Sequence, residues 1–160
     1  MSFDATDVLK FLHQSNLIEG VTDADSLLQS YYAWDCAMER DELSTGLILR
    51  AHKIIMLHQP ISPLHRGHWR NCAVSIGGEV ACHYSTVDGR MVQWVNKWKL
   101  ANLEEAIRQA HVEFEHIHPF VDGNGRTGRL VLNWQRVKAG LPILIIEDEN
   151  KGEYYQWFRS

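Results

Sequence analysis

Apolar side chains recur every three or four residues along most of this 160-residue chain, which is the spacing of one buried face of an α-helix. The predicted helices cover Asp4–Glu19, Ala24 to about Arg40, Ser44–Gln59, Asn102 to His116 or Ile117, Gly125 to about Lys138, and Glu147–Phe158. Each of these segments is predicted to form a helix with one apolar face, which must be buried against another part of the chain.

Polar residues mark where these helices begin and end. Thr22 or Asp23 stands as an N-cap before the second helix, and Asn102 with Glu105 has the spacing of a capping box. Pro119 disfavours helical backbone at the residue before it, which ends the central helix there. The apolar stripes expected to be buried in the second and third helices are Leu27, Leu28, Tyr31, Tyr32, Leu47, Ala51, Ile54 and Ile55.

The helical period is lost between residues 60 and 100. Segments 73–76 and 79–82 have the residue types of short strands, and the Gly-Gly pair at 77–78 fits a two-residue turn that requires positive φ. We therefore expect a small β-hairpin over residues 73–82.

Composition narrows the class of protein. A chain of 160 residues is long enough for one domain with a sizeable core, and a net charge of -4 argues against general affinity for nucleic acid. Cys36, Cys72 and Cys82 form no Cys-x-x-Cys motif and cannot all pair with one another, which favours a reducing compartment. No charged-then-apolar leader or membrane-length apolar run is present. We expect a cytoplasmic protein that binds neither nucleic acid nor a membrane.

The stretch His118–Arg129 reads His-Pro-Phe-Val-Asp-Gly-Asn-Gly-Arg-Thr-Gly-Arg and combines a base, a carboxylate, an amide and two guanidiniums. Charges buried without partners cost several kcal/mol, so this mixture suits a site for a polyanion better than a core. Gly123 and Gly125 allow the backbone to turn and to approach a ligand closely. The helix that follows presents its free N-terminal amides there, where its dipole also favours a phosphate.

The other polar residues of this stretch supply the remaining parts of a phosphate-transfer site. Arg126 and Arg129 stand three apart, so they share a helix face and can hold successive phosphates. Asp122 is a hard oxygen ligand suited to Mg²⁺, and the side chain of Asn124 can help to bind the anion. His118 is the candidate general base, because an unperturbed histidine has a pKa of about 6.5.

Other interpretations of the same residues have less support. Asp-Gly-Asn-Gly can form an ordinary turn. The spacing is not that of an EF-hand, because Thr127 and Asn133 stand where Gly and Glu are required, and no Gly-Lys-Ser/Thr follows for a Walker loop. The chain has nine histidines, but pairs such as His65 and His68 lack the further ligands of a zinc site. We expect every histidine except His118 to lie at the surface or at a helix cap.

The stretch resembles the signature of the Fic family, His-Pro-Phe-x-Asp/Glu-Gly-Asn-Gly-Arg-x-x-Arg, at every specified position. The resemblance implies an all-α Fic domain, a helical bundle with a small β-hairpin flap. It also implies transfer of AMP from ATP, with Mg²⁺, to a Ser, Thr or Tyr hydroxyl of a target protein. Doc-like phosphotransferases of the wider family typically carry a bulkier residue at the position of Gly123. The glycine of this chain therefore favours AMP as the transferred group.

The segment Ser15–Gly20 resembles the inhibitory motif of the family, Ser/Thr-x-x-x-Glu-Gly/Asn. In the family this glutamate pairs with the second signature arginine, here Arg129, and keeps the ATP γ-phosphate from its productive position. By resemblance, residues 1–20 would form an inhibitory helix in which Ser15 and Glu19 carry the motif. The alternative is that Glu19 is a solvated residue before an ordinary glycine cap.

Residues 67–83, which begin Gly-His-Trp-Arg, resemble the flap of the family. Such a flap holds an extended target segment by main-chain hydrogen bonds along an exposed strand edge. The Pro-rich stretch that follows the flap in the family is replaced here by His83-Tyr84-Ser85-Thr86. The resemblance implies a target protein docked along the hairpin, with self-modification or an oligomer also open; a hairpin without a binding role is the alternative.

The sequence therefore predicts a single Fic domain over residues 1–160 with protein adenylyltransferase activity. Three alternatives remain open: transfer of another phosphate-containing group, removal of AMP with Glu19 positioning water, and a silenced ATP-binding or interaction module. The aromatic side chains between residues 154 and 158 are expected to seal the core, with a partner-binding patch as the alternative.

Overall fold

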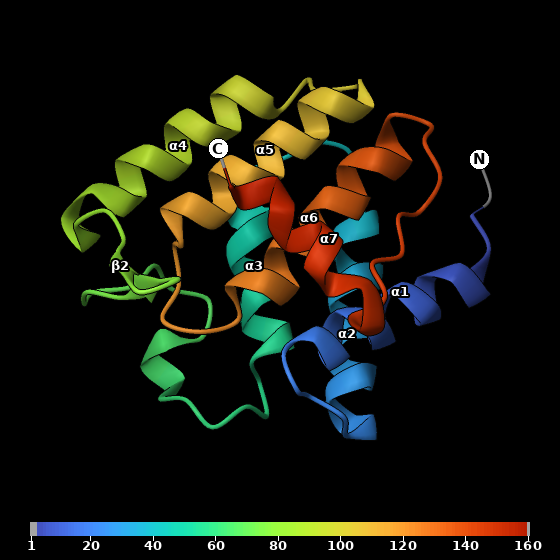
Figure 1. Cartoon of the computed structure of the whole chain (residues 1–160), viewed down its shortest axis with the longest axis horizontal. Coiled ribbons are helices and arrows are strands. Elements are labelled where there is room, and N and C mark those ends of the chain that lie inside the picture. The colour runs from blue at the N-terminus through green and yellow to red at the C-terminus, as the bar shows by residue number, and fades with distance from the viewer. Residues whose placement is uncertain (1–2, 160) are drawn as a thin grey trace.

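One helix, α6 (Asn124–Lys138), runs through the centre of the fold shown in Figure 1, a computed structural model that describes residues 3–159. The other helices are α1 (Ala5–Ile18), α2 (Ala24–Met38), α3 (Thr45–Ile55), α4 (Val87–Trp98), α5 (Glu104–Ile117) and α7 (Lys151–Tyr155). Helices α1, α2, α3 and α5 all pack against α6. Nearly every α6 residue from Asn124 to Arg136 is consequently buried, although several are polar. The fold is all-α, as predicted.

The core around α6 is apolar and closely filled. Its largest fully buried side chains include Trp94, Phe114, Phe120, Ile48, Met56 and Met91. Two buried indoles donate to backbone carbonyls, Trp94 to Ala110 and Trp134 to Ala37, each over 2.9 Å. These bonds satisfy the polar edge of each ring and join α4 to α5 and α6 to α2.

Five predicted helices, now α1, α2, α3, α5 and α6, lie where the hydrophobic pattern placed them. Asp23 caps α2, since its carboxylate accepts from the amide of Ser26 over 2.9 Å. Ser44 caps α3 in the same way, accepting from the amide of Leu47 over 3.0 Å. Helix α3 ends at Ile55 instead of the predicted Gln59, because the chain turns in the residues ahead of Pro60.

Three local expectations are wrong. The predicted capping box at Asn102 does not form, because α5 begins one residue later, with Leu103 at the N-cap and no side-chain cap. Leu28 and Tyr32 were expected in the core but are 46% and 52% exposed, since α2 turns a different face to α6. The buried face of α2 is therefore shifted from the predicted stripe and consists of Ser26, Ser30, Ala33, Trp34 and Ala37, while Leu27 and Tyr31 are partly buried.

Helix α4 was not predicted. Its buried residues Val87, Met91, Trp94 and Val95 nevertheless have helical spacing, and apart from the partly buried Trp98 the rest of the helix is exposed. The helical period is interrupted at the hairpin and returns in α4. Helix α4 packs on α5 and covers the side of the fold that carries the hairpin.

The predicted hairpin is confirmed, with strands β1 (Ser75–Ile76) and β2 (Glu79–Val80) paired antiparallel. Both turn glycines have positive φ, 54° at Gly77 and 87° at Gly78, as a tight two-residue turn requires. The hairpin extends from the helical body, and Val80 is 75% exposed.

The C-terminal segment is less regular than the single helix predicted. A 3₁₀ turn (Asp148–Asn150) leads into α7, and a second 3₁₀ turn (Gln156–Phe158) follows it. Tyr154 is 4% exposed and seals the core as expected, whereas Tyr155 is 43% exposed. This segment therefore has both a core-facing side and an open side.

The thiols of Cys36, Cys72 and Cys82 are all free, so no disulfide crosses the hairpin. Across residues 3–159, no helix combines the length and the apolar character needed to cross a bilayer.

Candidate active site

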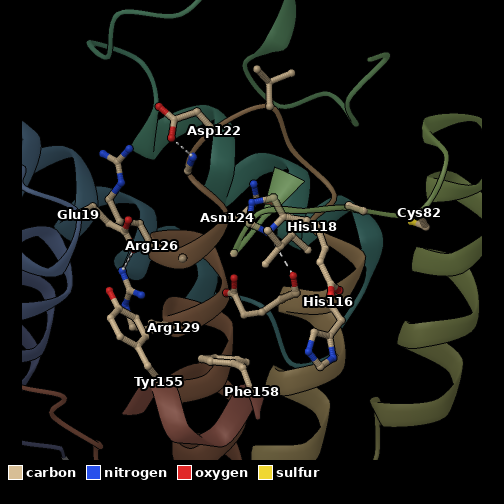
Figure 2. A pocket seen from close by; sticks show the side chains of 18 of the residues that line it. Glu19, Cys82, His116, His118, Asp122, Asn124, Arg126, Arg129, Tyr155 and Phe158 are labelled. Carbon is tan, nitrogen blue, oxygen red and sulfur yellow. Dashed lines mark hydrogen bonds and ion pairs between the residues drawn. The ribbon is translucent and has the colours of Figure 1, made fainter. Parts of the chain in front are cut away.

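One large pocket brings the stretch 118–129 together with three segments that are distant in the sequence. Its volume is about 950 Å³, and its walls come from the end of α1, the hairpin, the start of α6 and the C-terminal segment (Figure 2). The predicted site residues that line it are Glu19, His118, Asp122, Gly123, Asn124, Gly125, Arg126 and Arg129. Ser15, which is 5% exposed, lies behind this wall.

His118 ends α5 in a left-handed backbone conformation, with φ 51° and ψ 64°. Among residues 3–159 it is the only non-glycine residue with positive φ. That conformation costs an ordinary residue about 1–2 kcal/mol, so the contacts around His118 must hold it in place. It turns the chain sharply out of α5, with the amide of His118 still donating to the carbonyl of Phe114 over 3.0 Å.

The imidazole of His118 has a defined tautomer. Its Nδ1 lies 3.1 Å from the carbonyl oxygen of Glu115, which can only accept a hydrogen bond. Nδ1 therefore carries the proton and Nε2 keeps its lone pair. Burial of the half-exposed ring lowers the pKa of His118 below its ordinary value, so the ring is neutral at neutral pH. These are the properties of a general base.

The first turn of α6 offers backbone amides to the pocket. Gly123 is its N-cap, with φ 81° and no side chain to bond the amides of the first turn. A side chain at this position would meet Met56 and His52, so glycine is required for space as well as for φ. The amides of Asn124 and Gly125 have no carbonyl in a preceding turn, and they form the positive end of the helix dipole.

The side chain of Asn124 holds the loop before α6. Its Oδ1 accepts from the amide of Phe120 over 2.8 Å, and its Nδ2 donates to the carbonyl of Phe120 over 2.9 Å. Asn124 is 3% exposed. One Nδ2 hydrogen remains for the anion contact expected from the sequence, which stays a prediction.

Arg126 is a buried cation with incomplete bonding. Its side chain is directed at Met56, with Nη2 3.4 Å from Sδ, and its Nε has no hydrogen-bond partner in residues 3–159. Burial lowers the pKa of Arg126 without removing its charge at neutral pH. A buried, unsatisfied charged donor costs more than the roughly 1–3 kcal/mol of a neutral one. The pocket therefore suits an anion beside this guanidinium.

Arg129 is held from the N-terminal side by α1. Its Nη2 lies 2.7 Å from Oε1 of Glu19 and 3.0 Å from the carbonyl oxygen of Ser15. Its Nε donates to Oγ of Ser15 over 2.7 Å. The contact between Glu19 and Arg129 expected from the sequence is confirmed. The carboxylate of Glu19 occupies an acceptor position that an anion at Arg129 would otherwise take.

Residues of the hairpin and aromatic residues of the C-terminal segment complete the pocket. The hairpin was expected beside the base, as a flap that holds the target, whereas the aromatic residues were not expected in the site. Tyr155 and Phe158 line the side below Arg129 in Figure 2, and Ile76 and Val80 of the hairpin also face the space. These aromatic residues were expected to seal the core together with Tyr154. Their helical positions put them on the open side of the segment.

The expectation that all histidines except His118 lie at the surface or at caps is wrong for two of them, and His52 is the first. His52 is fully buried, and its ring stacks on Phe120 with centroids 3.6 Å apart. Its Nδ1 accepts from the amide of Gly67 over 3.0 Å, so its Nε2 donates to the carbonyl of Asp122 over 2.8 Å. Burial lowers the pKa of His52 to about 4, which keeps this bridge neutral.

His111 is the second buried histidine, and it adjoins an unpaired carboxyl group. Its Nε2 lies 2.7 Å from the hydroxyl of Tyr154, and its Nδ1 lies 3.2 Å from the carbonyl of Gly128. Glu115 is 9% exposed, and its Oε1 has no hydrogen-bond partner in the described chain. Burial raises the pKa of Glu115 to about 7. Only glycine fits at position 128, since a side chain there would collide with Glu115.

The expected Mg²⁺ ligand, Asp122, is an exposed carboxylate at the mouth of the pocket. Its Oδ1 accepts from the amide of Gly123 over 2.8 Å, which orients the group beside the start of α6. No cluster of three or more His, Cys, Asp or Glu side chains able to hold a metal occurs in residues 3–159. A lone carboxylate beside the free N-terminal amides of α6 fits Mg²⁺, which is usually held by one or two carboxylates, water and substrate phosphates.

Comparison with known proteins gives one family. Residues 42–135 match the model of the Fic/DOC family. The protein adenylyltransferase Fic of Drosophila erecta is 31% identical over 127 residues, covering 76% of this chain and 25% of that protein. The protein of the same name from Drosophila virilis is 32% identical over 127 residues, covering 76% of this chain and 26% of that protein. The chain thus spans about a quarter of the length of these relatives.

Solved structures share the fold. A Fic domain containing signaling protein from Bacteroides thetaiotaomicron aligns over 98% of this chain and 75% of its own, with a TM-score of 0.79 and 20% identity. A fragment of Fic-1 from C. elegans aligns over 96% of this chain and 55% of its own, with a TM-score of 0.76 and 22% identity. The similarity extends beyond the matched family region to α1 and the C-terminal segment.

Proposed function

Because this chain belongs to the Fic/DOC family, we propose that it is a protein adenylyltransferase, which moves AMP from ATP to a hydroxyl group of a protein. The observation that carries the proposal is the pocket, where a neutral imidazole, uncapped helix amides and two buried arginines surround one space. A base and a polyanion site in the same cavity suit transfer of a phosphate-containing group. The names of the relatives favour AMP as that group.

The phosphates of ATP would bind at the start of α6. The amides of Asn124 and Gly125 face the α-phosphate, and Arg126 and Arg129 hold the β- and γ-phosphates with their planar donors. The unpaired Nε of Arg126 supports this assignment, since a phosphate oxygen would supply its missing acceptor. Preorganised donors of this kind stabilise the charge that develops as the group is transferred.

The base would be His118. Its Nε2 takes the proton of a Ser, Thr or Tyr hydroxyl, the hydroxyl oxygen forms a bond to the α-phosphorus, and the bond from that phosphorus to the bridging oxygen breaks. Pyrophosphate leaves, and the proton stays on His118 until solvent removes it. The bond from Nδ1 to the carbonyl of Glu115 supports this role, because it leaves Nε2 as the free acceptor.

Asp122 would hold Mg²⁺ together with the ATP phosphates. When bound, the ion neutralises charge on the phosphates and on the leaving pyrophosphate. The exposed position of Asp122 leaves room for the water molecules that Mg²⁺ retains.

The adenine base would bind against the aromatic wall. Tyr155 is 43% exposed and, with Phe158, lines the pocket on the side of the C-terminal segment. Flat aromatic surfaces stack on a purine and add apolar contact without needing a hydrogen bond. We place the target protein on the opposite wall, along the hairpin, where strand edges are open for main-chain pairing.

Glu19 would restrain the reaction. Its bond to Arg129 places a negative charge where we assign the γ-phosphate, so ATP must displace Glu19 or bind in another position. Gly125 adjoins this contact closely, since a side chain there would collide with Glu19. The absence of a side chain at Gly125 thus leaves room for the carboxylate of Glu19, which supports its role as a restraint at Arg129.

Transfer of label separates the proposal from its alternatives. The chain with Glu19→Gly is incubated with Mg²⁺ and ATP that carries radioactive phosphorus at either the α or the γ position. Label from the α position alone on the protein is the result expected for AMP transfer. Label from the γ position alone would indicate a phosphotransferase. Release of AMP from a previously AMPylated target by the unsubstituted chain, which keeps Glu19, would favour hydrolytic removal of AMP. Binding of ATP without any transfer would favour a silenced nucleotide-binding module.

A further inference from the structure

We propose that Arg70 is a positioning residue. It joins the hairpin to the backbone of His118 and thereby fixes the position of the target hydroxyl relative to the base. This inference rests on the proposed function for its catalytic meaning. Its structural content, a link between two backbone segments, can be tested separately.

Arg70 lies just before the hairpin and is 2% exposed, so its guanidinium is buried. Its Nε donates to the carbonyl of His118 over 2.7 Å, and its Nη2 lies 3.3 Å from the carbonyl of Ile117. The amide of Arg70 donates to the carbonyl of Pro119 over 2.8 Å. One residue thus bonds three consecutive carbonyls at the turn from α5 into the pocket.

The same guanidinium also holds both sides of the hairpin base. Its Nη1 donates to the carbonyl of Cys72 over 3.1 Å, before β1. Its Nη2 donates to the carbonyl of Cys82 over 2.5 Å, after β2. The strands between are only two residues each, and a short hairpin is marginally stable by itself. Arg70 therefore fixes where the hairpin leaves the body of the protein.

The acceptors explain why arginine stands at this position. Four of the acceptors are backbone carbonyls and one is the sulfur of Cys82, 3.4 Å from Nη2, and no carboxylate in residues 3–159 forms an ion pair with Arg70. A planar guanidinium has five N–H donors in fixed directions, and no other side chain can reach acceptors on so many sides. Lysine would keep the charge but not the fork.

This link acts directly on the strained residue of the site. His118 holds its left-handed conformation only if neighbouring contacts fix it. Arg70 donates to the carbonyl of His118 and to the carbonyls of the residues on either side, Ile117 and Pro119. The imidazole is also held by Glu115, but that bond sets the ring and not the backbone. We infer that Arg70 sets the direction in which the base leaves the chain.

The charge of Arg70 has a second effect, on the pKa of His118. Burial of the ring is the largest influence and lowers this pKa, and the positive charge of Arg70 lowers it further. The carbonyl of Glu115 and the negative charges of Glu19 and Asp122 act in the opposite direction. Removal of the charge at position 70 should therefore raise the pKa of His118.

Three variants test the inference in the Glu19→Gly background. Arg70→Gln removes charge and fork, Arg70→Lys keeps the charge, and Arg136→Gln is the matched control. Arg136 is similarly buried, at 5% exposed, and bonds the carbonyl of Pro142 and the carboxylate of Glu104 outside the pocket. Each protein is measured for AMP transfer to itself, for the Michaelis constant of ATP, for the pKa of His118 by nitrogen NMR, and for hydrogen exchange of the hairpin amides.

The inference predicts that Arg70→Gln lowers the turnover rate by about 100-fold relative to Glu19→Gly alone, as expected when a reacting group is misplaced. The Michaelis constant of ATP should stay within about twofold of its value in Glu19→Gly. It also predicts a raised pKa of His118 and faster exchange at Ala81. Arg70→Lys should restore the pKa but not the rate, and Arg136→Gln should match the parent in all four measurements.

Equal behaviour of Arg70→Gln and Arg136→Gln would overturn the inference. If Glu19→Gly without a further substitution transfers no AMP, the proposed function fails. The pKa of His118 and the exchange of the hairpin amides then still decide whether Arg70 links the hairpin to the histidine. An unchanged pKa and unchanged exchange in Arg70→Gln would reject it.

Discussion

The carboxylate of Glu19 lies 2.7 Å from Nη2 of Arg129, although 110 residues separate the two in the sequence. Arg129 is 3% exposed and is bonded by Ser15 as well, so α1 is attached to the centre of the pocket through this arginine. One contact therefore serves the packing of α1 and occupies part of the proposed phosphate site.

Glu19→Gly is expected to raise the rate of AMP transfer. A hydrogen bond to a charged group contributes about 1.5–3 kcal/mol, so its loss should favour productive ATP binding by about 10- to 100-fold. The control is Glu104→Gly, which removes a similar bond, from Glu104 to the buried Arg136 over 2.6 Å, outside the pocket. Values of kcat/KM for ATP, from initial rates at ATP concentrations below the Michaelis constant, check the prediction, and equal values in the two variants would remove the restraint from Glu19.

His118→Ala is expected to lower the transfer rate by about 10²- to 10⁴-fold, the usual contribution of a general base. The control is His58→Ala, a histidine that is exposed and outside the pocket. Affinity for ATP, measured by calorimetry, should be unchanged in both. A rate for His118→Ala within a few fold of the control would reject the assignment of the base.

The pH dependence of transfer should reflect the buried position of His118. A base must be neutral to accept a proton, so the rate rises as pH increases through its pKa. Because burial lowers that pKa below the ordinary value of 6.5, activity should persist to pH values where a solvated histidine is already charged. The acidic limb of the profile of kcat/KM, which reports the free enzyme, checks this. A limb above pH 6.5 would contradict it.

Asp122→Asn is expected to raise the Mg²⁺ concentration needed for half-maximal transfer. Loss of an outer-shell partner alone costs about 10- to 100-fold in metal affinity or activity, and loss of a direct ligand should cost at least as much. Asp35→Asn, an exposed substitution outside the pocket, is the control. Titration of Mg²⁺ at fixed ATP measures the effect, and chelation of the metal should stop transfer by the parent. Coincident titrations for the two variants would exclude Asp122 as a ligand.

Glu115→Gln is expected to stabilise the protein at alkaline pH. Burial raises the folded pKa of Glu115 from 4.5 to about 7, so the stabilisation from its bound proton is complete below pH 4.5 and is lost as pH rises through 7. Glutamine stays neutral and avoids that loss. The free energy of unfolding should favour the variant by up to about 3 kcal/mol at pH 8, and by much less at pH 5.

Urea denaturation at the two pH values measures this difference. The control is Glu105→Gln on the same helix, where the glutamate is exposed and bonds Gln109 over 3.3 Å. A variant of Glu115 that shows no pH-dependent gain relative to this control would mean that the carboxyl group is already solvated or paired.

The parts of the site that follow one another in the sequence were predictable. His118, Asp122, Gly123, Arg126 and Arg129 lie within one turn and one helix start, so local rules for proline, glycine and helix N-termini place them together. The contact of Glu19 with Arg129 was found through a motif, and no local rule would have joined residues so far apart. Hydrophobic spacing placed five of the helices, and the all-α fold followed from the resemblance to the Fic family.

The residues that hold the backbone of the site by hydrogen bonds to its carbonyls were not predictable. Arg70 and His52 bond backbone carbonyls of the stretch 117–122, and a backbone acceptor leaves no trace in the identity of its own residue. Tyr155 lines the pocket because α7 turns one side outward, which the spacing of four aromatic residues does not specify. Helix α4, by contrast, was predictable from the sequence, because its buried apolar residues have helical spacing.

The proposed function is tested most directly by intact-protein mass spectrometry of three proteins after incubation with ATP and Mg²⁺: the parent, Glu19→Gly, and Glu19→Gly combined with His118→Ala. The predicted result is a mass increase of one AMP on Glu19→Gly, much less on the parent, and none on the double variant. An adduct on the double variant equal to that on Glu19→Gly would contradict the assignment of His118. An adduct of one phosphate instead of AMP would contradict the proposed reaction.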